Sequence, residues 1–251
     1  MPALAPDGTA VRPPLELPRR DRLPRTLVER QALALDVPLP WPVSAPAGPP
    51  PGDPEPWLVE ALRRHAAPEV VLDVDVAVIR RRRTRRVRAW HRLRGDRIAT
   101  LATAGGEVEV GLVPLRWWRA ELARVATVAL DGADPPPPRS VELPHELLLA
   151  GGHPDPRVRG ELLARHGAAV RAPGDPAAGE VVALLHRPVA RLQAVVAAGT
   201  RIGWTSWLGY GDGWRRLVPV VRDGRATVRV EPIGPGDLGV DVARLVAQVR
   251  P

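Results

Sequence analysis

The sequence predicts an α+β fold with a central antiparallel β-sheet built from two quasi-repeated halves and flanked by helical bundles. Two features support this prediction. First, two series of consecutive runs with alternating apolar and polar residues are joined by short turns that contain Gly or Asp, a pattern typical of antiparallel meanders. Second, helix-like segments accompany each series in the same order, which indicates two related α+β units sharing one sheet.

The chain has 251 residues, enough for one large domain or two small ones. We expect a first half over residues 1–132 and a second half over residues 133–251, together forming effectively one compact unit. Residues 1–14 are expected to be a loose tail. Residues 36–56 contain too many prolines for a helix or a central strand, so we expect an extended connection there.

In the first half, the spacing of apolar residues changes from helical to strand-like after residue 68. The expected elements are a short strand at 15–17, helices over 23–35 and 57–66, strands over 69–78, 85–93, 97–103 and 107–113, and a helix over 115–130. A turn centred on residues 81–82 places Asp75 opposite Arg88 and Asp73 opposite Trp90.

The second half repeats this order of elements with different spacings. The expected elements are a short segment at 141–144, a helix over 157–166, strands over 180–185, 189–197, 200–208, 214–222 and 225–231, and a helix over 237–249. The glycine-rich segment at 209–213 lies between two strand runs, whereas a phosphate-binding loop needs a helix after it. We therefore expect a hairpin turn there.

Residue types that carry common enzyme chemistry are missing or badly placed. The chain has no Cys, and every basic residue is Arg, which excludes disulfides, Cys-ligated zinc and Schiff-base lysines. None of Ser44, Ser140 and Ser206 lies in a G-x-S-x-G turn, and the histidines form no H-E-x-x-H motif. We expect no enzyme, and no catalytic, cofactor or metal site. Without an export signal or a long apolar stretch, we expect a cytoplasmic protein with no membrane insertion.

The formal net charge is +8, and the densest basic stretch is the hairpin Arg80–Arg88. Three interpretations stay open for this stretch: a solvated turn, a docking loop for an acidic protein surface, or a phosphate-contacting cluster for nucleic acid. The candidate partner-binding residues there are Arg80, Arg81, Arg82, Arg83 and Arg85. Trp204 and Trp207 are three apart on an expected strand and so face opposite sides. We expect one of them to be exposed for a partner.

Several segments, taken in order, resemble the EspG family of type VII (ESX) secretion-associated proteins of actinobacteria. They are ERQALALDVPLPWPV (29–43), PEPWLVEALRRHAAPEVVLDVDVAV (54–78), RGDRIATLA (94–102), LPHELLLAGG (143–152) and the closing stretch that begins at Gly209-Tyr210. The resemblance covers most of the chain.

The resemblance implies a cytosolic, non-catalytic chaperone that binds a helical secretion substrate, a PE/PPE-like heterodimer, and covers its hydrophobic tip before export. It further implies that the central sheet, a hairpin loop of the first half and the C-terminal helical region hold this tip. In this sequence the loop corresponds to Arg80–Arg85, and the sheet contacts include Trp204 and Trp207. We expect a monomer when the protein is free. Nucleic-acid binding through Arg80–Arg88 remains the alternative function.

Overall fold

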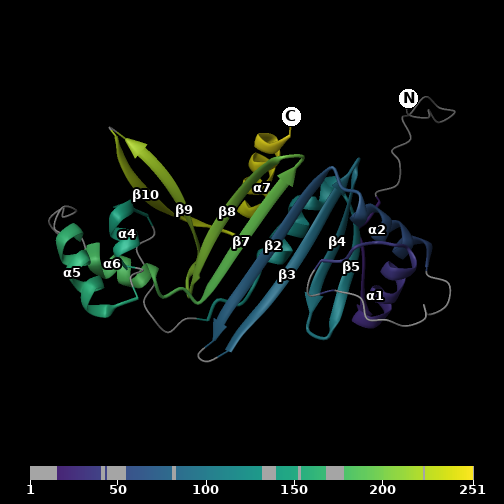
Figure 1. Cartoon of the computed structure of the whole chain (residues 1–251), viewed down its shortest axis with the longest axis horizontal. Coiled ribbons are helices and arrows are strands. Elements are labelled where there is room, and N and C mark those ends of the chain that lie inside the picture. Colours follow the sequence, from purple (N-terminus) through teal and green to yellow (C-terminus); the bar gives the residue numbers. More distant parts are fainter. Residues whose placement is uncertain are drawn as a thin grey trace, which may run out of the picture.

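The computed structural model describes residues 16–40, 43, 55–80, 83–131, 140–151, 154–167, 178–222 and 224–250. It confirms the α+β class: a ten-stranded antiparallel sheet is flanked by helices (Figure 1). The strands are β1 (Arg19–Pro24), β2 (Val70–Arg80), β3 (Arg83–Arg94), β4 (Arg97–Ala104), β5 (Glu107–Pro114), β6 (Val141–Pro144), β7 (Ala190–Ala198), β8 (Arg201–Tyr210), β9 (Gly213–Arg222) and β10 (Arg225–Ile233). The helices are α1 (Arg25–Ala34), α2 (Pro56–Ala66), η1 (Leu115–Trp117), α3 (Trp118–Ala126), α4 (His145–Gly151), α5 (Pro156–Gly167), α6 (Ala178–Leu185) and α7 (Asp237–Val249).

The strand order is mirrored about the centre of the sheet. It runs β1-β5-β4-β3-β2-β7-β8-β9-β10-β6, so each side is a four-stranded meander with a short strand at its outer edge. The two sides meet where β2 pairs with β7. The tail expected at 1–14, most of the connection expected at 36–56 and the boundary expected at 132–133 lie outside the described residues.

The hairpin of β2 and β3 has the register expected from its alternating residues. Asp75 pairs with Arg88 and Asp73 pairs with Trp90. The β2 residues that alternate with these two aspartates point to the opposite face of the sheet, where Val74 and Val76 are buried. A slip of one residue would bury both carboxylates, so the apolar face fixes this register.

One expected strand is a helix. The run at 180–185 lies in α6, where Val181, Val182 and Leu185 are buried. Spacings of one and four residues put these side chains on one face of a helix. Figure 1 shows α6 among the helices beside β10. A five-residue apolar run fits a buried strand and a buried helix equally well, which explains the wrong prediction.

Two further boundaries differ from the prediction. The first strand is Arg19–Pro24, and Glu16 and Leu17 precede it without being part of a strand. Its arginine-rich sequence has little apolar alternation because it is an edge strand that pairs only with β5. The helix expected to run to residue 130 ends at Ala126, since Thr127 adopts an extended conformation.

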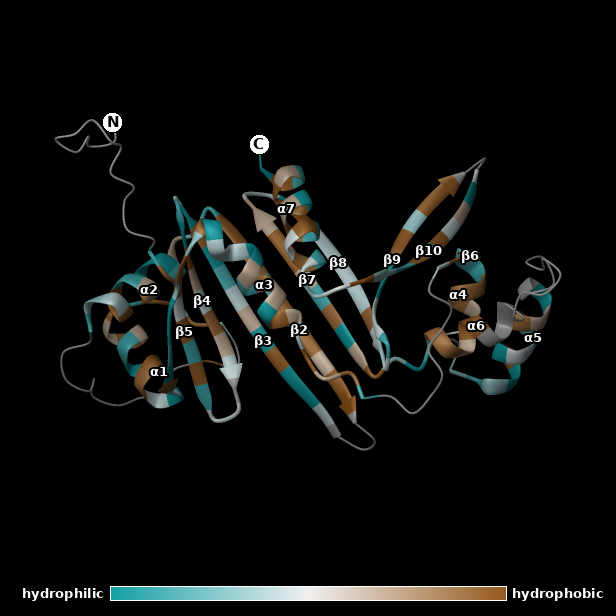
Figure 2. Cartoon of the chain, turned by 180° about the vertical axis from the view of Figure 1, so that it is seen from behind, coloured by the Kyte–Doolittle hydropathy of each residue, from teal (hydrophilic) through white to brown (hydrophobic). Residues whose placement is uncertain are grey.

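Helices cover different parts of the two sheet faces. α3 and α7 pack on one face of the central strands, as Figure 2 shows, where the largest hydrophobic cluster lies. α1 and α2 pack on the opposite face, over β3, β4 and β5, with Trp90 in their cluster. α4, α5 and α6 contribute to a third cluster with β6, β9 and β10. The stretch of β7 and β8 opposite α7, here called the open face, therefore carries exposed side chains.

Candidate protein-binding site

An apolar strip lies on the open face. Its members Val195, Ile202 and Trp204 are 42%, 71% and 68% exposed, whereas the alternate residues of β7 are buried under α7. Because these exposed apolar side chains are neighbours on one face, they form a candidate interaction surface. We call Val195, Ala197, Ile202 and Trp204 the open-face strip.

The strip is continuous because its members pair across two strands. Val195 lies opposite Trp204, and Ala197 lies opposite Ile202. Paired side chains on one face have Cβ atoms about 5 Å apart. Val71 of β2, half-buried, lies opposite Ala197 and extends the apolar surface across a third strand.

Neutralised charges border the strip on β2 and β3. Asp73, which pairs with Val195 in the register, accepts a hydrogen bond from Arg92 Nη1 at 2.6 Å. Asp75 forms ion pairs with Arg86 and Arg88 at 3.0 and 3.4 Å. These arginines are therefore held by carboxylates of the same sheet, and the border of the strip has little uncompensated charge.

The predicted arginine hairpin lies at the other end of β2. Arg80 pairs with Arg83 at the end of the ladder, while Arg81, Arg82 and the side chains of Arg80 and Arg83 lie outside the described residues. Arg85 is exposed and pairs with Val78, so it is on the face that α3 covers. Arg80 lies seven positions from Asp73 along β2, about 23 Å. The structure therefore does not bring Arg85 and Trp204 together.

The two predicted tryptophans face opposite sides, as expected. Trp204 is exposed, whereas Trp207 is fully buried and donates from Nε1 to Asp241 Oδ2 at 3.0 Å. Its ring lies 6.1 Å from that of Trp214, centroid to centroid. Trp207 is a core residue in this structure and is not part of the open-face strip.

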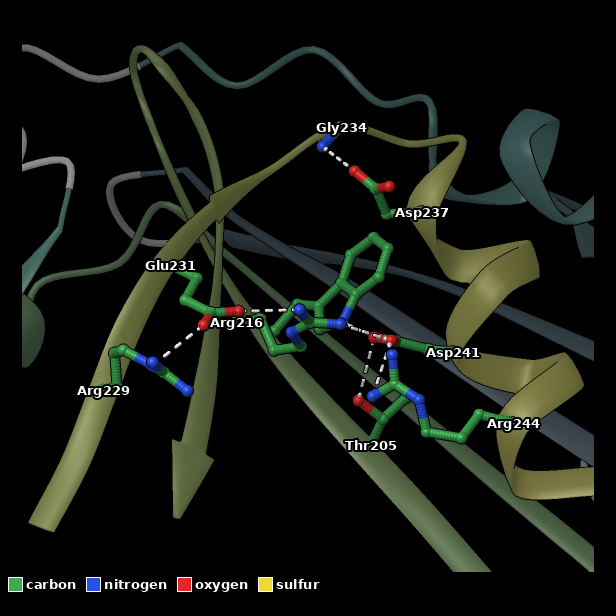
Figure 3. Close-up of polar contacts among 9 residues, drawn as sticks. Thr205, Arg216, Arg229, Glu231, Gly234, Asp237, Asp241 and Arg244 are labelled. Carbon is green, nitrogen blue, oxygen red and sulfur yellow. Dashed lines mark hydrogen bonds and ion pairs between the residues drawn. The ribbon is translucent and has the colours of Figure 1, made fainter. Parts of the chain in front are cut away.

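Asp241 is the centre of a polar network under the strip (Figure 3). It is 3% exposed and pairs with Arg216, which also donates to Glu231 at 2.7 Å. Hydrogen bonding and the charge of Arg216 lower the pKa of Glu231 although partial burial raises it. Arg229 completes the row with an ion pair to Glu231 at 2.9 Å. The network joins α7 to β8, β9 and β10 at the last residue pair of the β8–β9 ladder, Trp207 and Arg216.

The buried histidines are structural. Burial lowers the pKa of His65 to about 3, and Arg92 and His91 add to the effect. Burial also lowers the pKa of His91 to about 4 against the raising effect of Glu121. His91 Nδ1 accepts a hydrogen bond from Trp118 Nε1 at 3.0 Å, which requires the neutral ring. Both rings are therefore uncharged at neutral pH.

Over the described ranges, no three His, Asp or Glu side chains are grouped as ligands for a metal ion. The glycine-rich segment at 209–213 is the hairpin turn between β8 and β9, as predicted, with Tyr210 paired to Gly213. Within the same ranges, no helix is long and apolar enough to cross a membrane. The open-face strip is therefore the candidate site that we consider among the described residues.

Comparison with known proteins gives a likeness in fold. No family model matches the sequence, and no curated protein matches it. Among solved structures, the chain is similar to that of the Mycobacterium tuberculosis type VII secretion system chaperone EspG5 in complex with the PE25–PPE41 dimer, with a TM-score of 0.60 and 16% sequence identity. The match covers 92% of this chain and 97% of the other. The fold is therefore EspG-like over nearly its whole length.

Proposed function

We propose that this protein is a chaperone that binds a helical substrate of a type VII secretion system, a PE/PPE-like pair, before export. The proposal combines the EspG-like fold with one observation on this chain: the open-face strip around Trp204. A hydrophobic helical tip needs an apolar surface to cover it, and the strip offers such a surface on a rigid sheet. We further propose that Trp204 and the rest of the strip contact the hydrophobic tip and that Arg80–Arg85 contacts a separate part of the substrate.

The neutralised border of the strip supports protein binding over nucleic-acid binding. Three arginines next to the strip, Arg86, Arg88 and Arg92, are paired with Asp73 and Asp75. Trp90, which lies among them in the sequence, is buried and offers no base-stacking platform. Arginines near the hairpin tip, and exposed ones elsewhere such as Arg63 and Arg191, remain for phosphate contacts.

The test is co-purification of the tagged protein with a PE/PPE-type pair expressed alongside it, above about 200 mM salt, where phosphate contacts are already weak. We expect one pair at fixed stoichiometry. Trp204→Asp should abolish capture because it places a charge inside the strip. Leu33→Asp on α1 is the matched control, since Leu33 is also exposed but lies on the far half of the molecule, and should capture normally.

A second variant tests the arginine hairpin separately. Replacing Arg80, Arg81, Arg82 and Arg83 with Ser should leave folding intact and reduce capture, chiefly by slowing association. Equal capture by this variant would remove the hairpin from the site without affecting the strip. Equal capture by Trp204→Asp and Leu33→Asp would remove the strip from the site. Recovery of no pair, or of nucleic acid that dissociates as salt rises, would refute the chaperone proposal.

A further inference from the structure

The outer edge of β8 is only partly used. β8 spans ten residues, but β9 pairs with it only over Trp207–Tyr210. Past this paired stretch, β9 and β10 together diverge from β8, as Figure 1 shows. One lateral edge of β8, from Arg201 to Ser206, therefore has no neighbouring strand among the described residues.

The turns at both ends of β8 determine which backbone groups point to that edge. Ala198 and Arg201 flank a two-residue turn between β7 and β8, and Tyr210 and Gly213 flank another between β8 and β9. The flanking pair of such a hairpin exchanges backbone hydrogen bonds. Odd-numbered residues of β8 thus bond to β7, and even-numbered residues point to β9.

Ile202 and Trp204 then have outward N–H and C=O groups without a strand to bond, and the outward N–H of Ser206 lies next to the last residue pair with β9. In the described part of the chain, no strand pairs with Ile202 or Trp204 on this edge, and no turn or loop group bonds to their backbone. Ile202 and Trp204 are also the two most exposed members of the open-face strip. Unpaired ladder groups therefore coincide with exposed apolar side chains, which is the arrangement that accepts an added strand.

We propose that β8 binds an extended segment of a partner protein as an additional β-strand along Ile202–Ser206. Its alternate side chains that lie on the open face contact Ile202 and Trp204 and are apolar. Those on the other side lie beside Thr205 and Arg244 and are polar. This inference goes beyond the proposed function, because strand addition does not depend on which helical substrate the chaperone binds.

The size of the free edge favours one strand of a partner over a second copy of this chain. Five residues span about 16 Å, enough for a peptide segment. A stable dimer requires at least about 1,000 Å² of buried surface, which a five-residue edge contact falls short of. The segment must lack proline at the bonding positions, since proline has no N–H to donate.

The probe is a synthetic, labelled seven-residue peptide of alternating Val and Thr with blocked ends. Its twin has the same side chains but N-methylated internal amides, so it keeps the apolar contacts and loses the donors. We expect the peptide to bind and the twin to bind at least about tenfold more weakly, because several hydrogen bonds are lost. In NMR hydrogen exchange, the peptide should slow the amide protons of Ile202, Trp204 and Ser206 and leave those of Gly203 and Thr205 unchanged.

Two variants of the protein complete the test. Ser206→Pro removes one outward N–H without removing a bond to β7, as an edge position allows, and should weaken peptide binding about tenfold. Ser206→Ala is the matched control and should bind as the natural chain does. If Ser206→Pro fails to fold, the comparison of peptide and twin and the exchange pattern on the natural chain still show whether the peptide binds as an added strand.

Three results would overturn the proposal: equal binding of peptide and twin, slowed exchange without the alternating pattern, or a dimer that protects the same amides without peptide. The assay contains no secretion substrate. Its failure therefore leaves the chaperone proposal standing, and failure of substrate capture leaves strand addition standing.

Discussion

Replacing Asp241 tests how β8, β9 and α7 are held together. The carboxylate is buried and accepts from Trp207 Nε1 while pairing with Arg216. In Asp241→Ala, the Trp207 N–H has no acceptor and Arg216 keeps only Glu231. Removing one partner of a buried ion pair costs about 3–5 kcal/mol. Because the Arg216 side chain is 20% exposed and retains Glu231, we expect the lower end, about 3 kcal/mol.

The loss is measured by urea unfolding followed by tryptophan fluorescence. For a chain of this length, about 3 kcal/mol corresponds to a fall in Tm of about 6–12 °C. Asp241→Asn keeps an acceptor for Trp207 and loses only the charge, so its stability should lie between that of the natural chain and that of Asp241→Ala.

The matched control is Glu161→Ala on α5. Glu161 pairs with Arg157 at 3.3 Å, and both side chains are largely exposed. Exposed pairs of this kind contribute about 0–1 kcal/mol, so the control should unfold near the natural midpoint. If Asp241→Ala unfolds together with Glu161→Ala, the network does not hold the hairpin and our reasoning is wrong.

Three further predictions concern pH, close packing and exposure. Since burial lowers the pKa of His65 to about 3 and of His91 to about 4, the unfolded chain takes up protons below pH 6.5 that the folded chain does not. The free energy of unfolding should be insensitive to these groups above pH 7 and should fall by about 2 kcal/mol per histidine at pH 5. Urea titrations at pH 7 and pH 5 check this, and in His65→Met the fall in unfolding free energy should be about half as large. Gly239→Ala should destabilise the protein by about 1–3 kcal/mol because its Cβ would lie 2.4 Å from Arg119 Cγ and 3.2 Å from Arg119 Cα. Gly160→Ala, whose Cβ would have nothing within 4 Å, should stabilise α5 by up to about 1 kcal/mol. A destabilised Gly160→Ala or a neutral Gly239→Ala would contradict this account. Trp204→Phe should change the unfolding free energy by less than about 0.5 kcal/mol and remove more acrylamide-quenchable fluorescence than replacement of a buried tryptophan does; unchanged quenching would mean that Trp204 is covered.

The meander strands could be predicted from the sequence because each alternating run has one buried face. The register of β2 and β3 followed from this alternation and from the position of the turn. The helix α6 could not be predicted in the same way, since Val181, Val182 and Leu185 satisfy either a strand or a helix. Its type is decided by contacts with α4 and α5, which are remote from any local pattern.

The candidate site was predictable only in part. Spacing alone showed that Trp204 and Trp207 face opposite sides of a strand, but not which side is covered. The packing of α7 decides this, because its residues Leu245 and Val249 lie against Gly203 on the face that Trp207 shares. The free edge of β8 left no signal in the sequence, since it depends on where β9 separates from the sheet.

The distribution of charge explains why a basic chain need not be a nucleic-acid-binding protein. Many arginines are committed to carboxylates within the fold: Arg92 to Asp73 beside the strip, Arg124 to Glu121 under β1, and Arg216 to Asp241 under α7. A guanidinium held by a buried or half-buried carboxylate adds little to the field that a distant phosphate experiences. The surface that remains chemically distinctive is then apolar. Recognition by this protein is therefore expected to depend on the shape and edge of β8, with unpaired arginines affecting mainly how fast a partner approaches.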